Sequence, residues 1–176
     1  MKINTQQITL IALFIAFCLL VPFLFHLVGL GKMFLPMFLP ILLAGFIIDF
    51  PSAMIVGFLG PWISALATGM PPLFPTALSM SIEGIVTAGL ASYLYHEKHI
   101  SFWIGLILAV IAQRLARVVM LLLILPFFGL PVKALSIADF AYSLPGVLLQ
   151  LFLTPIILFM LWKSKIIERK SWLKTF

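Results

Sequence analysis

Apolar residues fall into six long runs along the chain, and short stretches rich in polar residues, glycine or proline separate them. A helix needs about 20 apolar residues to cross the hydrocarbon core of a bilayer, and four of the runs reach about that length. The pattern therefore predicts an all-α integral membrane protein, a single domain of six transmembrane helices at about residues 8–27, 33–48, 53–68, 76–95, 102–126 and 142–162.

The second run, 33–48, is short and contains Pro36 and Pro40. Each proline removes a backbone donor and interrupts a helix. Interrupted backbone at membrane depth is tolerated where protein or a water-filled cavity satisfies its polar groups. We therefore expect the first half of this run to lie beside a cavity.

Composition and charge narrow the class of protein. Of the 176 residues, 64% are hydrophobic and 9% are charged, a balance that excludes a soluble domain. The net charge is +6, but five of the eleven basic residues lie in the tail at 163–176, so they do not indicate a nucleic-acid surface. A six-helix layout puts one side of the membrane in contact with Lys2, Lys98 and the basic tail. Only Lys32 and Lys133 then lie on the other side. Because basic residues favour the inner side of a membrane, both termini are expected in the cytoplasm.

The fifth run carries Gln113, Arg114 and Arg117 near its middle. An arginine near the centre of a span costs at least ~2.5–3.5 kcal/mol on insertion scales, so such a residue usually has a function. The two arginines lie about 60° apart on one helix face, within reach of one shared space. The opposite face is a stripe of small residues that favours close helix packing, namely Gly105, Ala109, Ala112 and Ala116.

Four polar side chains on three predicted helices share one depth. At 1.5 Å per residue, Glu83, Arg114, Arg117 and Gln150 all lie roughly 12–18 Å below the outer surface. The apolar loops at 29–32, 69–75 and 129–138 lie on that same outer side. This arrangement predicts a solute pocket that opens outward, with the loops as lids.

One acid can neutralise only one of the two arginines, which leaves a positive charge that an anionic solute could offset. We expect Arg114 and Glu83 to brace the fold and Arg117 to lie nearer the solute. A purely structural ion-pair cluster is the alternative. Gln113, four residues before Arg117, is expected to orient it. Gln150 is expected to make either a helix–helix hydrogen bond or a contact with the ligand.

The chain resembles the substrate-binding S components of energy-coupling factor (ECF) transporters over almost its whole length. Three segments carry the resemblance: MFLPMFLPILLAGF at 33–46, GMPPL at 69–73 followed by Glu83, and Arg114 with LPGVLLQ at 144–150. Many relatives have a histidine where this chain has Phe38, so a polar contact from that position is missing. The resemblance implies a six-helix bundle with a solute site that includes Met37 and Met70. Phe34, Phe38 and Phe74 could stack on a ring-shaped solute.

The resemblance also implies partners. Relatives work with a transmembrane coupling (T) subunit and two ATPases in the cell membrane of a prokaryote, taking up vitamin-like solutes. Ala12 and Ala16 fit the small-residue pair with which the first helix of the family docks on the coupling subunit, although such pairs are common in membrane helices. Nothing in the sequence resembles a phosphate-binding loop, so ATP hydrolysis is assigned to the partners, and no cofactor or metal is expected.

Two other classes are weaker. An integral membrane enzyme would need a catalytic set, and the predicted spans contain one acid and no serine–histidine–acid group at one depth. A stand-alone small transporter or channel would need polar residues along its whole length, whereas here they share one level. Two arginines against one glutamate favour a small anionic or zwitterionic solute. Pantothenate-like carboxylates would fit, as would pyrimidine or pyridine rings held by the aromatic side chains.

Overall fold

The structure, a computed structural model, describes residues 5–27, 29, 34–120, 122, 125–127 and 143–164. All regular secondary structure in these residues is helical, which confirms the predicted all-α fold. The helices are α1 (Thr5–Leu27), α3 (Phe38–Ile47), α4 (Phe50–Thr68), α5 (Leu78–Ser92), α6 (Phe102–Val119), α7 (Leu125–Phe127) and α9 (Leu144–Lys163). Single π-helical turns, η1 (Leu73–Ala77) and η2 (Tyr93–Glu97), flank α5.

Five helical segments among the described residues are long and apolar enough to cross a membrane, namely α1, α4, α6, α9 and the continuous segment Leu73–Glu97. The remaining predicted span, the second, corresponds to α3, which is only about 15 Å long at 1.5 Å per residue. The count of six crossings therefore stays a prediction. The basic tail beyond residue 164 and the loop at 129–138 lie outside the described residues.

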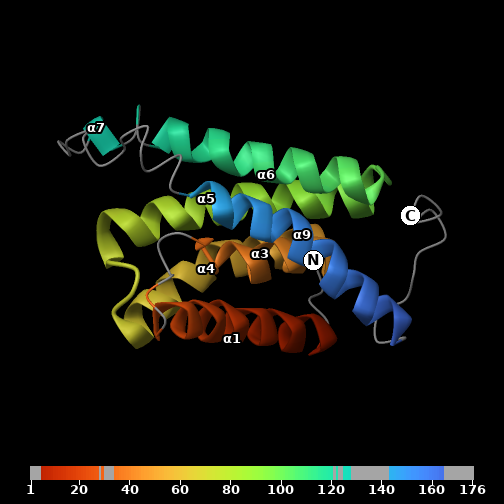
Figure 1. The fold of residues 1–176 in the computed structure, drawn as a ribbon, viewed down its shortest axis with the longest axis horizontal. Helices are drawn as coiled ribbons and strands as arrows, with labels where there is room; N and C mark the ends of the chain where they lie inside the picture. The colour runs from red at the N-terminus through yellow and green to blue at the C-terminus, as the bar shows by residue number, and fades with distance from the viewer. Residues whose placement is uncertain are drawn as a thin grey trace.

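The long helices run side by side along the longest axis of the molecule (Figure 1). Helix α5 packs against α3, α4 and α6, and α1 packs against α4, so α3, α4 and α5 form the centre. Helix α9 crosses over this centre, contacting α3 and touching α6 much less. The start of α1 and the end of α9 lie at the same end of the molecule, which we name the Lys163 end.

Helix α3 is the central core helix. Every one of its residues except Ile47 is buried, as expected for a helix that is apolar on all sides. The helix begins at Phe38 and not at residue 33, because Leu35, next to Pro36, has a positive φ of 45° and a residue before proline is disfavoured in helical conformation. Met37 is 2% exposed and Phe38 0%, so both lie among the core residues, and the expected cavity beside the first turn stays a prediction.

The fifth predicted span corresponds to α6 and α7. The sequence pattern predicts one helix over 102–126; α6 covers Phe102–Val119 and α7 covers Leu125–Phe127. Met120 and Leu122, between these helices, are π-helical. Residues 121, 123 and 124 lie outside the described residues, so the far end of this span stays a prediction.

Serine hydroxyls of α5 donate hydrogen bonds to backbone carbonyls of the neighbouring segments. The Ser81 hydroxyl of α5 donates to the Phe58 carbonyl of α4 at 3.0 Å. The Ser92 hydroxyl donates to the Ile48 carbonyl, just after α3, at 2.9 Å. Buried polar atoms without partners cost stability, so these bonds hold α5 in register with both neighbours.

Helices α4 and α5 approach each other closely at a pair of glycines. A Cβ atom placed on Gly57 would overlap the backbone of Gly84, and one placed on Gly84 would overlap the backbone of Gly57. Small residues allow this close backbone approach between membrane helices. The glycine pair therefore fixes the distance between the two helices, one of which carries Glu83.

We expect Gly57→Ala to destabilise the protein by about 1–3 kcal/mol, because the added methyl group has no space and overpacking costs this much. Gly105→Ala is the matched control, since its methyl group would lie 3.6 Å from the nearest atom of the Phe46 ring, an ordinary contact. The measurement is the melting temperature of both variants in detergent. An equal loss in both would contradict the close α4–α5 contact.

Candidate functional site

The charged residues of the membrane interior meet where α5 packs against α6. Glu83 of α5 is 1% exposed, and its Oε2 lies 3.9 Å from Nη1 of Arg117, whose side chain is 24% exposed. The prediction that Glu83 pairs with Arg114 is therefore wrong: the ion pair joins Glu83 to Arg117. Both arginines lie on the same side of α6, and the packing of α5 decides which of them reaches the carboxylate.

Arg114 instead ties α6 to the beginning of α9. Its Nη1 donates a hydrogen bond of 3.0 Å to the Ser143 hydroxyl, and Ser143 is the residue immediately before α9. Ser143 is 4% exposed, so the bond is shielded from solvent. Arg114 does brace the fold, as expected, but between α6 and α9 and not between α6 and α5.

The ion pair of Glu83 and Arg117 is loose. A charge-assisted hydrogen bond spans about 2.7–2.9 Å, whereas these atoms are 3.9 Å apart and Glu83 Oε2 has no hydrogen-bond partner. The guanidinium is close enough to offset the buried carboxylate, yet its donors are not committed to it. A planar guanidinium with uncommitted donors can bind a carboxylate or phosphate in a bidentate manner.

Two buried carboxamides, Gln113 of α6 and Gln150 of α9, lie at a similar depth. Both are 0% exposed, and neither the oxygen nor the nitrogen of either has a hydrogen-bond partner. The rings of Phe102 and Trp162 are 6.2 Å apart and set the register of the antiparallel helices α6 and α9. Gln113 is eleven residues from Phe102, and Gln150 is twelve residues from Trp162, which is about 17–18 Å along each helix. The two carboxamides therefore lie at a similar depth.

This geometry changes the role of Gln113. The sequence predicts that it orients Arg117, but its polar atoms make no hydrogen bond to that residue. Gln150 makes no helix–helix hydrogen bond either, and Thr154, one turn further along α9, is also buried without a partner. The sequence signal for an independent role of Gln113 is only that an uncharged polar residue stands in an apolar run.

The remaining predicted solute contacts divide into two groups. Met37 and Phe38 belong to the core, while Met70 and Phe74, between α4 and α5, are 55% and 52% exposed. Phe34 is half-buried, with its ring 5.8 Å from that of Phe25 in α1. A common solute site for these five side chains stays a prediction.

The predicted docking pair lies on the outer surface of α1. Ala12 and Ala16 are both exposed, while the buried residues of the same helix are Phe14, Cys18 and Pro22. The alanines therefore have no packing role inside the described bundle. In the described part of the chain, no group of three or more histidine, cysteine, aspartate or glutamate residues could hold a metal ion.

Comparison with known proteins gives one match. The model of the family described as "ECF transporter, substrate-specific component" matches residues 6–164, which is most of the chain. No curated protein matches, and no solved structure matches.

Proposed function

The chain belongs to the family of ECF transporter substrate-specific components, and from this membership we propose that it captures a small anionic or zwitterionic, vitamin-like solute for ATP-driven uptake. The family and the apolar helices make it a multi-pass membrane protein and a transport subunit, not an enzyme. Membership therefore favours transport over the membrane-enzyme and channel alternatives.

The observation that carries the proposal is the charged cluster between α5 and α6. Glu83 Oε2 lies 3.9 Å from the Arg117 guanidinium, too far for a charge-assisted hydrogen bond, so the donors of Arg117 can bind an anionic group of a solute. Charge buried in a membrane is expensive, which favours a solute group of opposite sign beside this guanidinium.

Polar groups deeper in the bundle support a solute that also forms hydrogen bonds. The carboxamides of Gln113 and Gln150 each offer a donor and an acceptor with no protein partner. An unsatisfied buried polar group costs about 1–3 kcal/mol, and a solute with an amide-like edge would recover part of this cost. Because both side chains are fully buried, the solute can reach them only if α6 and α9 move apart or the side chains rotate.

We place this subunit in a complex with a transmembrane coupling subunit and two ATPases in a prokaryotic cell membrane. ECF substrate-specific components work with such subunits. The exposed pair Ala12 and Ala16 is the proposed docking face. With both termini in the cytoplasm, as the basic residues predict, the arginines would lie in the outer half of the membrane, where a solute arrives.

The experiment that tests the function is the identification of a bound solute. We expect the protein, purified from membranes of the cells that express it, to carry a small molecule with a carboxylate or another anionic group, detected by mass spectrometry of the denatured sample. A protein with Arg117 replaced by alanine, purified in parallel, is expected to lose that molecule. A cationic compound present equally in both preparations would contradict the proposal.

A further inference from the structure

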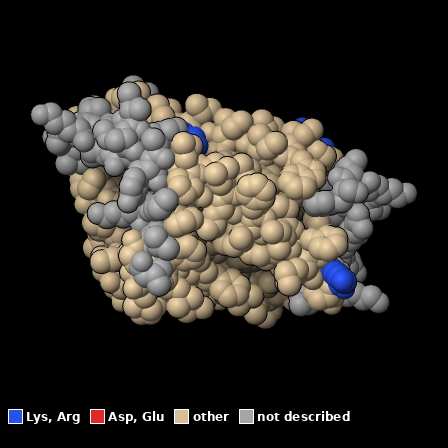
Figure 2. All heavy atoms as spheres, in the orientation of Figure 1, with Lys and Arg blue, Asp and Glu red and all other residues tan. Residues whose placement is uncertain are grey.

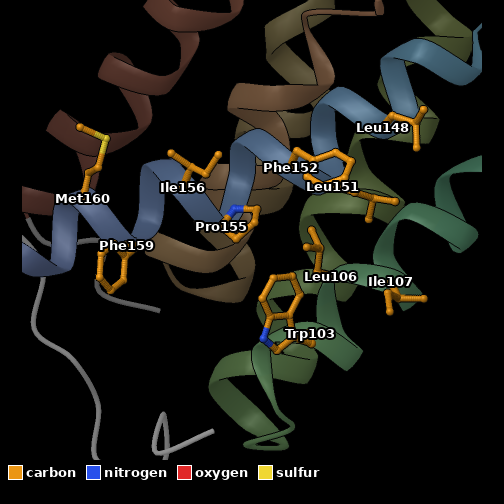
Figure 3. A pocket seen from close by; sticks show the side chains of 10 residues that line it. All are labelled: Trp103, Leu106, Ile107, Leu148, Leu151, Phe152, Pro155, Ile156, Phe159 and Met160. Carbon is orange, nitrogen blue, oxygen red and sulfur yellow. The ribbon is translucent and has the colours of Figure 1, made fainter. Parts of the chain in front are cut away.

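A hollow lies between α6 and α9, towards the Lys163 end. It has a volume of about 680 Å³ and is lined by side chains of those two helices alone, all of them hydrophobic. Figure 3 shows the side chains of α9 on one wall, with Leu106, Ile107 and Trp103 of α6 on the other. The hollow exists because α6 and α9 touch each other little along this length.

The hollow faces lipid. Ile107 of α6 is 49% exposed, and Phe152 and Ile156 of α9 are 66% and 54% exposed. The face of the molecule in Figure 2 is almost entirely uncharged, apart from a few basic atoms. A hydrophobic groove at this depth in a membrane protein is filled by hydrocarbon, because a polar solute would find no hydrogen-bond partners there.

The dimensions of the groove suit an acyl chain better than a helix. On α9 it extends from Leu148 to Met160, which is about 18 Å, close to the ~15 Å of hydrocarbon in one leaflet. A transmembrane helix from a partner would extend through about 30 Å and prefers small residues at its contact. The walls here are bulky leucine, isoleucine, phenylalanine and tryptophan side chains, unlike the alanine pair on α1.

A basic residue continues the α9 wall of the groove at the membrane surface. Lys163 is exposed, and it follows Phe159 by four residues and Ile156 by seven, so it lies on the same helix face. Lysine can lay its apolar stem along the groove and keep its ammonium group at the interface. An ammonium group at the end of a lipid-filled groove attracts the phosphate of an anionic lipid.

The geometry points to a lipid-binding site: one acyl chain of an anionic phospholipid occupies the groove between α6 and α9, with its phosphate at Lys163. This site differs from the proposed solute site in its chemistry, because all of its lining side chains are hydrophobic. Helices α6 and α9 also carry Gln113 and Gln150. The bound acyl chain would therefore keep apart two helices that contribute to the proposed solute site.

Native mass spectrometry of the full-length protein tests the proposal. The protein is relipidated with phosphatidylglycerol or with phosphatidylcholine of the same acyl chains, and the retained lipids are counted. We expect one retained lipid and a preference of about fivefold for phosphatidylglycerol, the ratio that corresponds to the ~1 kcal/mol of one lysine near an anionic surface. Lys163→Gln should abolish the preference. Lys98→Gln, an exposed lysine near the same end of the molecule, should retain it.

A second pair of variants tests the groove itself. Ile107→Trp combined with Ile156→Trp should fill it from its exposed side and lower lipid retention to the level of a nonspecific lipid. Leu115→Trp is the matched control, because Leu115 is 60% exposed on α6 and does not line the groove. Equal retention of both lipids by the wild-type protein, or unchanged retention by the filled variant, would overturn the proposal. A dimer that the filled variant abolishes would instead assign the groove to a second copy and would also overturn it.

Discussion

Replacement of Arg117 by alanine is expected to weaken binding of the co-purifying solute more than tenfold, which is at least ~1.4 kcal/mol. The Arg117 side chain is 24% exposed, while its ion-pair partner Glu83 is buried. A solute that reaches the cluster therefore meets the guanidinium first. Titration of the purified protein with the identified solute measures the effect. Arg117→Lys should recover only part of the affinity, because lysine keeps the charge and lacks the planar fork.

The control must separate binding from folding. Removing Arg117 alone leaves the Glu83 carboxylate buried without its ion pair, and breaking a buried pair in this way can cost 3–5 kcal/mol. We therefore pair the variant with Glu83→Gln and with the double change Glu83→Gln, Arg117→Ala, in which neither charge remains. The double variant should melt closer to the wild type and still fail to bind. Wild-type affinity in the double variant would show that both residues serve only the fold.

The sequence was sufficient to predict the fold class and the positions of the long helices, because long apolar runs in a chain with few charges permit little else. It could not predict where α3 begins. The apolar pattern continues through this boundary, and local backbone geometry around Pro36 decides it. The burial of α3 at the centre was also not predictable, because an apolar helix can face either lipid or protein.

At the candidate site, the sequence predicted which polar residues share a depth but not how they pair. Helical periodicity puts Arg114 and Arg117 on one face, and an arginine side chain is long enough to reach either neighbouring helix. The partners depend on the packing of α5 and on the position of Ser143, both set by contacts distant in sequence. The groove between α6 and α9 depends on the space left between two helices, for which no sequence pattern exists.

The docking prediction separates binding from transport. Ala12 and Ala16 are four residues apart, so they project about 40° from each other on one exposed face of α1. If this face docks on the coupling subunit, the residues need to be small only when the partner is present. Replacing both with tryptophan should leave the melting temperature and solute affinity of the isolated subunit nearly unchanged. The same change should abolish uptake, because bulky rings prevent the close approach of two membrane helices.

The matched control for this variant is the pair Leu13 and Phe17, which are also four residues apart and exposed on α1. This pair lies about 100° around the helix from the alanine pair. Their replacement by tryptophan adds aromatic surface to lipid-facing positions that are already large, so uptake should be largely retained. Uptake is measured in proteoliposomes of the assembled complex, and co-purification with the ATPases is measured on the same samples. Loss of solute affinity together with uptake in the alanine variant would mean that the pair serves packing of the bundle. Full uptake by that variant would mean that the coupling subunit docks elsewhere on the protein.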